Sequence, residues 1–227
     1  MKPMIKYAGE AAVVIVFGEE IDEKINSIVH AVAKNIESDN PEWLEEVVPT
    51  YTSVYVYYDP IVVNYDKLRF LLKNYLKKVE PEGHGKTVKL PVVYGGKYGP
   101  DIEFVAKYNG LSVEDVIELH CKPLYRVYML GFLPGFAYLG GMDKRIATPR
   151  LKVPRLRVPA GSVGIAGDQT GWYAIDSPGG WRIIGRTPVR TFNPDNEPPS
   201  IVLPGDYVQF VPINEDEFEK YRGEILD

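Results

Sequence analysis

The sequence predicts two domains, an α+β domain over residues 1–86 and a mainly β domain over residues 87–227. Helix-like and strand-like apolar patterns alternate as far as residue 94. Of the 21 glycines, 17 lie after residue 86, as do 14 of the 19 prolines, a distribution typical of short strands joined by tight turns. The segment 80–85 (EPEGHG) separates these two compositions and is the predicted linker.

The first domain shows two helical stripes among strands. Apolar side chains recur every third or fourth position over residues 21–36, and again over residues 65–79, where Asn64 is the predicted N-cap. Pro49 divides the alternating segment 47–58 into two strands. With strands at 5–17 and 87–94, the order is strand–helix–strand–strand–helix–strand. This order predicts a ferredoxin-like unit, in which two helices cover one face of an antiparallel sheet.

The second domain contains one predicted helix, residues 112–120, with Ser112 as N-cap and Glu114 and Asp115 in the first turn. The remaining apolar runs are short and lie between glycines and prolines. They cover residues 125–130, 162–166, 172–175, 181–184, 200–203 and 207–211. Many short strands with this punctuation predict a β-barrel or a β-sandwich.

Composition excludes several classes of protein. Hydrophobic residues make up 45% of the 227 and charged residues 25%, as in ordinary globular proteins. No apolar run reaches the roughly 18–20 residues of a membrane-spanning helix, and the N-terminus lacks the pattern of a signal peptide. A single cysteine, Cys121, allows no internal disulfide, and three separated histidines form no metal-ligand pattern. We expect a cytoplasmic protein without a metal site.

The charge distribution argues against a nucleic-acid-binding protein. Residues 1–86 have 10 basic and 14 acidic side chains, and the overall net charge is −5. Residues 87–212 are weakly basic, with 14 basic and 11 acidic side chains, which is too little for a nucleic-acid-binding domain. A local anion site in this second half remains open.

A glycine-rich segment, residues 131–141 (GFLPGFAYLGG), is the first candidate site. Glycine amides such as that of Gly135 can approach a ligand closely, with aromatic side chains as walls. The alternative is a tight corner of the barrel whose aromatic rings pack inward. The predicted pocket wall consists of Phe132, Pro134, Phe136, Tyr138 and Trp181.

A basic stretch follows directly. Residues 144–157 contain six basic side chains and no acidic one, with prolines that exclude a regular helix. Arg150, Arg155 and Arg157 are predicted to bind anions, because guanidinium groups match carboxylates and phosphates. The alternative is a set of solvated surface charges.

Further candidates are turn residues and one histidine. Gly161 and the segment 177–181 (SPGGW) predict turns, or anion-facing amides and a hydroxyl from Ser177, Gly179 and Gly180. His120 is the best candidate proton carrier, although a lone histidine is more often structural. No phosphate-binding loop, dinucleotide fingerprint or nucleophile elbow is present.

Eight short motifs occur in a fixed order over some 110 residues. They are 95–101 (GGKYGPD), 111–120, 130–141, 149–155, 158–162 (VPAGS), 177–181 (SPGGW), 185–188 (GRTP) and 204–206 (PGD). Together they resemble the family of the 5-oxoprolinase B subunit, also known as KipI and as allophanate hydrolase subunit 1. The resemblance covers essentially the whole chain.

The resemblance implies a fold, an activity and partners. The second domain would be a cyclophilin-like barrel. With the C subunit (KipA-like, allophanate hydrolase subunit 2) and the A subunit of 5-oxoprolinase, the chain would open 5-oxo-L-proline to L-glutamate. The complex would use ATP, with Mg²⁺, as a co-substrate rather than a tightly bound cofactor. Homologous modules form the carboxyltransferase part of urea carboxylase.

Two alternatives follow from the same resemblance. Some members of the family inhibit a sensor histidine kinase, so the chain could be an interaction protein that docks on such a kinase. A cyclophilin-like barrel also suggests prolyl isomerase activity, but fold alone does not establish function.

Overall fold

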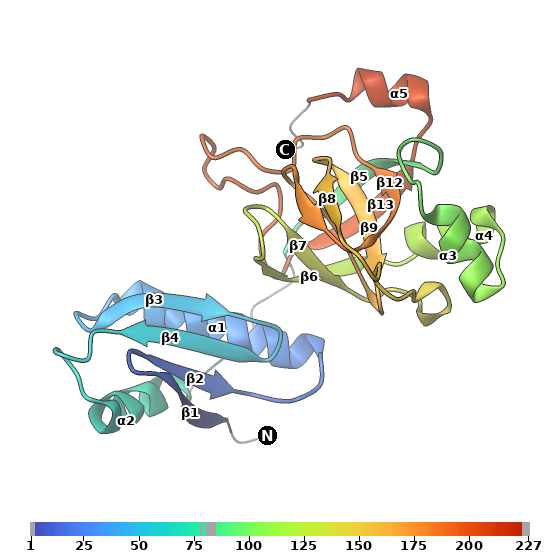
Figure 1. Cartoon of the computed structure of the whole chain (residues 1–227). Helices are drawn as coiled ribbons and strands as arrows, with labels where there is room; N and C mark the ends of the chain where they lie inside the picture. Colours follow the sequence, from blue (N-terminus) through green and yellow to red (C-terminus); the bar gives the residue numbers. More distant parts are fainter. Residues whose placement is uncertain (1–2, 78, 80–84, 224–227) are drawn as a thin grey trace. The chain divides into compact units, whose positions relative to one another are not determined.

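The computed structural model describes residues 3–77, 79 and 85–223 of the chain. It divides into two compact units, residues 1–84 and 85–227, and each is described by itself (Figure 1). Sequence alone places the boundary after residue 86. Of the predicted linker, residues 80–84 lie outside the described residues.

The N-terminal unit is an antiparallel sheet with two helices. Its elements are β1 (Met4–Gly9), β2 (Ala12–Val16), α1 (Glu23–Asp39), β3 (Leu44–Pro49), β4 (Ser53–Tyr58) and α2 (Tyr65–Tyr75). The strands are ordered β1-β2-β4-β3. Both helices and the sheet share one hydrophobic core, which includes Val13, Val56, Val32 and Leu72. On the other sheet face Tyr55 and Tyr57 are exposed, so this unit buries one face of its sheet.

The predicted order of elements in this unit is wrong. Residues 5–17 form a hairpin rather than one strand, because the chain bulges between Tyr7 and Gly9 and reverses before Ala12. Gly9 has φ +146°, a conformation that side chains disfavour. The strand predicted at 87–94 belongs to the other unit. The unit therefore runs ββαββα, and β1 occupies the sheet edge beside β2.

Helix ends in this unit follow their capping residues. Asn64 accepts a hydrogen bond from the Lys67 N–H at 2.9 Å, which confirms it as the N-cap of α2. Asp22 caps α1 in the same way through Ile25. The break predicted at Pro49 is also confirmed, since β3 ends there and β4 begins at Ser53.

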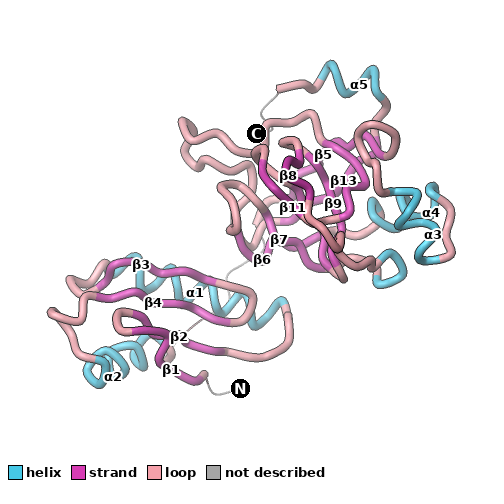
Figure 2. Tube along the Cα trace, viewed as in Figure 1, coloured by secondary structure: helices cyan, strands magenta, loops and turns pink. Residues whose placement is uncertain are grey.

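The second unit is built around a closed seven-stranded barrel. In barrel order the strands are β10 (Gln169–Trp172), β7 (Ala137–Gly140), β6 (Tyr125–Leu130), β13 (Tyr207–Pro212), β5 (Thr87–Tyr94), β12 (Arg182–Arg186) and β9 (Ser162–Ala166). Among the described strands, β5 and β13 alone pair in parallel. A separate two-stranded sheet joins β8 (Arg155–Val158) to β11 (Ser177–Gly179) (Figure 2). The other described elements of this unit are three helices, α3 (Ile102–Asn109), α4 (Val113–Cys121) and α5 (Glu215–Lys220), and the 3-10 turn Lys144–Ile146.

The barrel interior is filled by side chains. Leu90, Val127, Ile165 and Phe210 belong to one buried cluster, together with the fully buried ring of Trp172. Small barrels have room for little more than their own side chains. A ligand site on this unit is therefore expected on its outer surface or in its loops.

Most of the predicted barrel elements are present, with several corrections, among them that the predicted strand 172–175 is a strand only at Trp172, where β10 ends. Ser112 caps α4 in a complete capping box with Asp115, and the strands at 125–130 and 162–166 lie where predicted. Helix α3 was not predicted, because Phe104 and Tyr108 are exposed and obscure its short apolar stripe. Helix α5 was also not predicted. Residues 200–203 form no strand, only a single bridge between Ser200 and Phe192.

Candidate functional site

His120 lies inside the barrel, in a chain of hydrogen bonds whose directions can be assigned. Thr170 donates its only hydroxyl proton to the Gly164 carbonyl at 3.0 Å. At the 2.8 Å contact between Nε2 and the Thr170 oxygen, His120 must therefore be the donor. Nδ1 is then the acceptor, and it receives the Tyr94 hydroxyl proton at 2.7 Å. The Cys121 thiol donates to the same Tyr94 oxygen at 3.4 Å.

This environment argues against His120 as the proton carrier. The side chain is fully buried, and burial lowers the pKa of His120 from 6.5 to about 3. The imidazole is neutral near pH 7, and both ring nitrogens are occupied by Tyr94 and Thr170. A proton carrier needs a path to the reacting group. We therefore correct the sequence-based assignment: His120 is a structural residue of the barrel core.

The aromatic residues of the predicted pocket wall divide into buried and exposed members. Phe136 and Trp181 are buried in a small cluster with Tyr173, where their rings meet edge to face. They are core residues rather than an open wall, in agreement with the alternative interpretation. Tyr138 packs partly against them, whereas Phe132 is 64% exposed. Pro134, between the two phenylalanines in sequence, is also exposed.

The predicted anion-binding glycines serve close packing instead. The Gly161 N–H donates to the Tyr173 carbonyl at 2.7 Å, so it is not free for a ligand. A Cβ at Gly135 would clash with Phe192, and one at Gly179 would clash with the Tyr173 hydroxyl. These positions require glycine because another chain segment lies against the backbone.

The other two residues predicted to face an anion in the turn 177–181 are Gly180 and Ser177. The Gly180 carbonyl accepts the Leu151 N–H at 2.7 Å, which fastens the basic stretch to the turn. Ser177 is buried opposite Val158, and its hydroxyl forms no hydrogen bond with the described residues. The Ser177 hydroxyl is thus enclosed, whereas an anion-facing Gly180 amide stays a prediction.

The three predicted arginines have different partners. Arg157 binds Asp176 through two nitrogens, at 2.6 and 2.9 Å, and its side chain is largely exposed. Arg155 pairs with the buried carboxylate of Asp101 at 2.8 Å. Arg150 pairs with no carboxylate in the described part of the chain, and its guanidinium lies 5.9 Å from the centre of the Trp181 ring. Arg150 is thus the best placed of the three to bind an added anion.

Asp101 fixes the position of Arg155. One of its carboxylate oxygens binds the arginine, and the other accepts the Ile183 N–H at 2.7 Å. Asp101 also stands at the N-terminus of α3. In the sequence this aspartate ends the motif 95–101, without a predicted role. Because its partner is 54 positions away, the pattern of the sequence offers no means of pairing the two.

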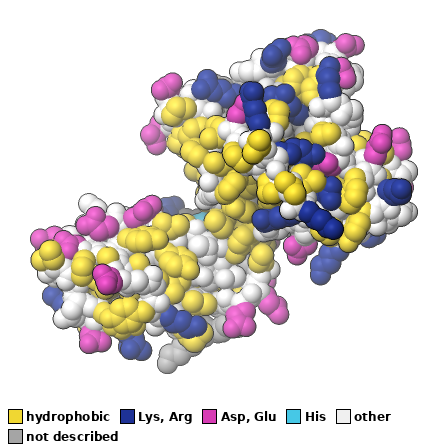
Figure 3. Space-filling model, in the orientation of Figure 1, with side chains coloured by type: hydrophobic (Ala, Val, Ile, Leu, Met, Phe, Trp, Pro, Cys, Tyr) yellow, Lys and Arg dark blue, Asp and Glu magenta, His cyan; other side chains and the backbone are white. Residues whose placement is uncertain are grey.

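Arg150 lies within a wider patch, which we call the Arg150 surface and define as Phe104, Arg150, Arg155 and Arg182, with the buried ring of Trp181 beneath Arg150. Arg182 stacks on the Phe104 ring at 3.7 Å and donates to the carbonyl of Pro149, the neighbour of Arg150. In the adjoining stretch of chain, Val153 is 81% and Leu156 is 93% exposed. Figure 3 shows Lys and Arg side chains beside hydrophobic ones on the barrel unit. Exposed aromatic, aliphatic and arginine side chains together are typical of protein interfaces.

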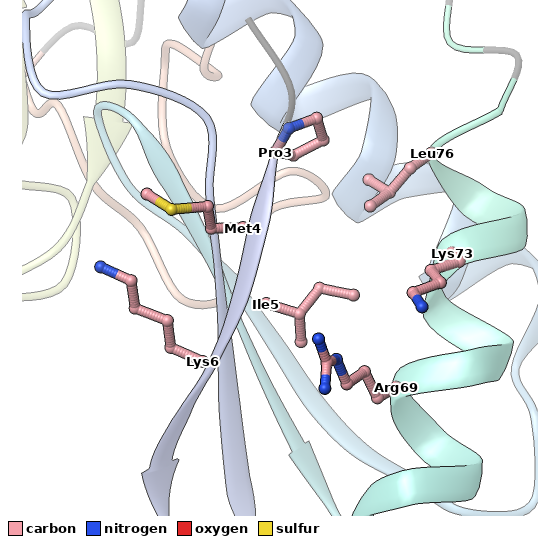
Figure 4. A pocket seen from close by; sticks show the side chains of 7 residues that line it. All are labelled: Pro3, Met4, Ile5, Lys6, Arg69, Lys73 and Leu76. Carbon is pink, nitrogen blue, oxygen red and sulfur yellow. The ribbon is translucent and has the colours of Figure 1, made fainter.

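The N-terminal unit has a hollow of its own. It lies between β1 and α2 and has a volume of about 770 Å³. Ile5 and Leu76 provide its apolar surface, and Arg69 and Lys73 extend from α2 (Figure 4).

Within the described residues no helix is long and apolar enough to cross a membrane.

Comparisons with known proteins agree with this organisation. A family described as "Carboxyltransferase domain, subdomain C and D" matches residues 3–202. The 5-oxoprolinase B subunit of Bacillus subtilis is 45% identical over 97% of each chain. That of Escherichia coli O157:H7 is 38% identical over 91% of this chain and 94% of its own.

Solved structures show the same similarity. The protein PH0987 of Pyrococcus horikoshii is 65% identical, with a TM-score of 0.58, over 95% of this chain and 100% of its own. TTHA0988 is 38% identical, with a TM-score of 0.80, over 93% of this chain but 40% of its own. Urea amidolyase from K. lactis, at 22% identity and a TM-score of 0.80, shares the fold over 15% of its length. The chain therefore belongs to the family of 5-oxoprolinase B subunits.

Proposed function

We propose that the chain is the B subunit of an ATP-dependent 5-oxoprolinase, which opens 5-oxo-L-proline to L-glutamate together with partner subunits. The observation that carries the proposal is the 45% identity, over 97% of both chains, to a protein named as that subunit. The family description names subdomains C and D, which implies further subdomains supplied from elsewhere. Ring opening would be a property of the complex.

The chemistry sets what the complete site must contain. A lactam carbonyl is a poor electrophile, and phosphorylation of its oxygen by ATP makes the ring carbon easier for water to attack. Such a site needs cationic groups and N–H donors for the phosphates and the carboxylate. In this proposal Mg²⁺–ATP is a co-substrate of the assembled complex, and this chain contributes cationic groups to it.

In this proposal the Arg150 surface meets the partner. Its exposed neighbours Val153 and Leu156 would be buried by docking, and Arg150 would supply a positive charge at the edge of the joint site. The length of TTHA0988 supports a partner alongside, because the region similar to this chain makes up 40% of that protein. The rest of TTHA0988 is further protein joined to the same module.

The test measures ATP-dependent glutamate release from 5-oxoproline, first with the chain alone and then with partner subunits co-expressed. Activity is expected only in the full mixture. Leu156→Asp should abolish co-purification of the partner, and Arg150→Ala should lower turnover about tenfold or more if it contacts a developing negative charge. Arg145→Ala, which removes an exposed arginine paired with Asp143, is the matched control.

Arg155→Ala is a poor first variant, because it would leave the Asp101 carboxylate buried without its cation. Loss of activity in that variant would reflect damage to the fold as much as to the site. No turnover in a verified, assembled complex would contradict the proposed substrate. Inhibition of a sensor histidine kinase and prolyl isomerase activity stay predictions, tested by autophosphorylation and proline-peptide assays.

A further inference from the structure

A pocket of about 220 Å³ opens on the barrel unit, at the end of β12. Its lining comes from separate segments of the chain that meet there. They contribute Ala160, Gly161, Ala174, Arg186, Thr187, Pro188, Val189, Arg190, Phe218 and Arg222. Three of these ten residues are arginines, and none is an acid. None of the arginines belongs to the Arg150 surface.

The walls of the pocket are held by backbone hydrogen bonds. The Thr187 N–H donates to the Gly161 carbonyl at 2.9 Å, and the Gly223 N–H donates to the Pro188 carbonyl at 3.1 Å. Gly161 has φ +82°, and a Cβ there would clash with the Thr187 carbonyl oxygen. Glycine is required at this position because the two segments touch, so Gly161 builds the wall of this pocket.

Each arginine is oriented by a contact with the described residues and keeps other donors that bind none of them. Arg186 donates from Nε to the Ala160 carbonyl at 2.8 Å, and its two terminal nitrogens bind no group in the described part of the chain. Arg190 donates from Nε to the Phe192 carbonyl at 3.3 Å. Arg222 shares one terminal nitrogen with Glu219, at 3.2 Å. Guanidinium groups held in this way bind carboxylates and phosphates with little loss of conformational freedom.

The local charge balance is positive. The neighbouring acid Asp176 already accepts the Ala160 N–H and binds Arg157. Those bonds, and the charge of Arg186, lower the pKa of the Asp176 carboxyl. Asp176 is thus ionised and offsets one arginine, and Glu219 offsets Arg222 in part. Among the described residues, positive charge therefore exceeds negative charge at the mouth of the pocket.

The size of the pocket limits what it can hold. Ligand sites for larger organic molecules commonly span roughly 300–1,000 Å³, and at ~30 Å³ per molecule this pocket would hold about seven waters. This volume favours a compact ligand over a nucleoside triphosphate. Ala174, Val189 and the buried Phe218 form an apolar floor. We propose that this pocket binds a compact anion, a small organic carboxylate or inorganic phosphate, through Arg186, Arg190 and Arg222.

The proposal is independent of the proposed function, because binding is measured on the full chain without partners. The chain is titrated at fixed ionic strength with inorganic phosphate, then with 5-oxo-L-proline, then with ATP, and backbone amide resonances are followed by NMR. We expect saturable shifts at Gly161, Thr187 and Arg190 with one or both compact anions. Which of the two binds more tightly decides between phosphate and carboxylate.

Two variants locate the site. Arg190→Gln and Arg222→Gln remove exposed side chains without unpairing a buried acid, and each should weaken binding about tenfold. Arg145→Gln removes one positive charge elsewhere on the unit and should change the affinity by less than about twofold.

Three outcomes would overturn the proposal. They are shifts that do not saturate, equal weakening by Arg145→Gln, and tighter binding of ATP to the same amides. Failure here leaves the glutamate-release assay of the complex unaffected, so the two proposals can fail separately.

Discussion

The two units bury polar groups in different ways. Among the described residues of the N-terminal unit, the buried polar side chains Asn26, Ser27 and His30 all lie on one helix, α1. Asn26 donates to two carbonyls at the turn between β3 and β4. In the barrel unit, Asp101 and His120 reach strands far along the chain. The first unit thus takes its buried polar groups from a single helix, whereas the second takes them from several elements that meet only in the fold.

The largest expected effect is a loss of stability of the barrel unit at acid pH, caused by the buried His120. Since burial lowers the pKa of His120 from 6.5 to about 3, protonation favours the unfolded chain. The stability that neutral His120 provides is complete above pH 6.5 and is lost as the pH falls from 6.5 toward 3. The loss reaches about 5 kcal/mol at the lower end of that range. Urea unfolding at several pH values, followed by tryptophan fluorescence, measures it.

His120→Gln is the matched variant for this experiment, because it removes the titrating group and keeps a side chain that can hydrogen-bond to Thr170. Its stability near neutral pH should be lower, but its decline on acidification should be shallower. An equal decline in both proteins would show that other groups cause the acid sensitivity of the barrel.

The second effect tests whether the N-terminal unit has an independent core. Leu72 is fully buried on α2, and Leu72→Ala should destabilise this unit by about 3 kcal/mol. The barrel transition should stay where it is, because the two units have separate hydrophobic clusters. Phe70→Ala, on the same helix but 68% exposed, is the control and should cost little. A matching shift in both transitions would contradict independence.

The smallest expected effect is the loss of stability when the Asp101–Arg155 ion pair is broken. Asp101→Ala should destabilise the barrel by about 2 kcal/mol, less than for a fully buried pair, since the Arg155 side chain is 31% exposed. Asp101→Asn keeps a hydrogen bond to the Ile183 N–H and should recover part of the loss. Denaturant unfolding measures both. Arg145→Ala, which removes the exposed arginine of the pair with Asp143, should have almost no effect, and a similar loss there would remove the distinction.

Local patterns could predict what local contacts determine. The caps Asn64 and Ser112 were found because each bonds to a residue three positions on. The roles of His120 and Arg157 could not be found in this way, since their partners Thr170 and Asp176 lie 50 and 19 positions away. A titratable or charged residue type indicates candidate chemistry, but partners brought by the fold decide whether it is free to act.

The same distance limited the prediction of the anion pocket. The motif 185–188 (GRTP) was recognised, but Arg186 was given no role within it. Arg222 joins the pocket from 36 positions along the chain, beside the bond from the Gly223 N–H to the Pro188 carbonyl. The sequence feature that could have singled out Arg186 is its position next to Gly185, where the close approach of another segment requires glycine.

The parallel pairing of β5 with β13 has a consequence for synthesis of the protein. Thr87 pairs with Tyr207, so β5, the first barrel strand in the chain, can complete the barrel wall only after β13, the last one, has been synthesised. At roughly 5–20 residues per second, a ribosome needs about 6–24 s to add that intervening chain. During this interval the hydrogen-bonding edge of β5 that β13 later covers has no permanent neighbour, while the N-terminal unit has already been made. An unpaired strand edge is a template for pairing with other chains, so the nascent barrel is exposed to such pairing in that interval.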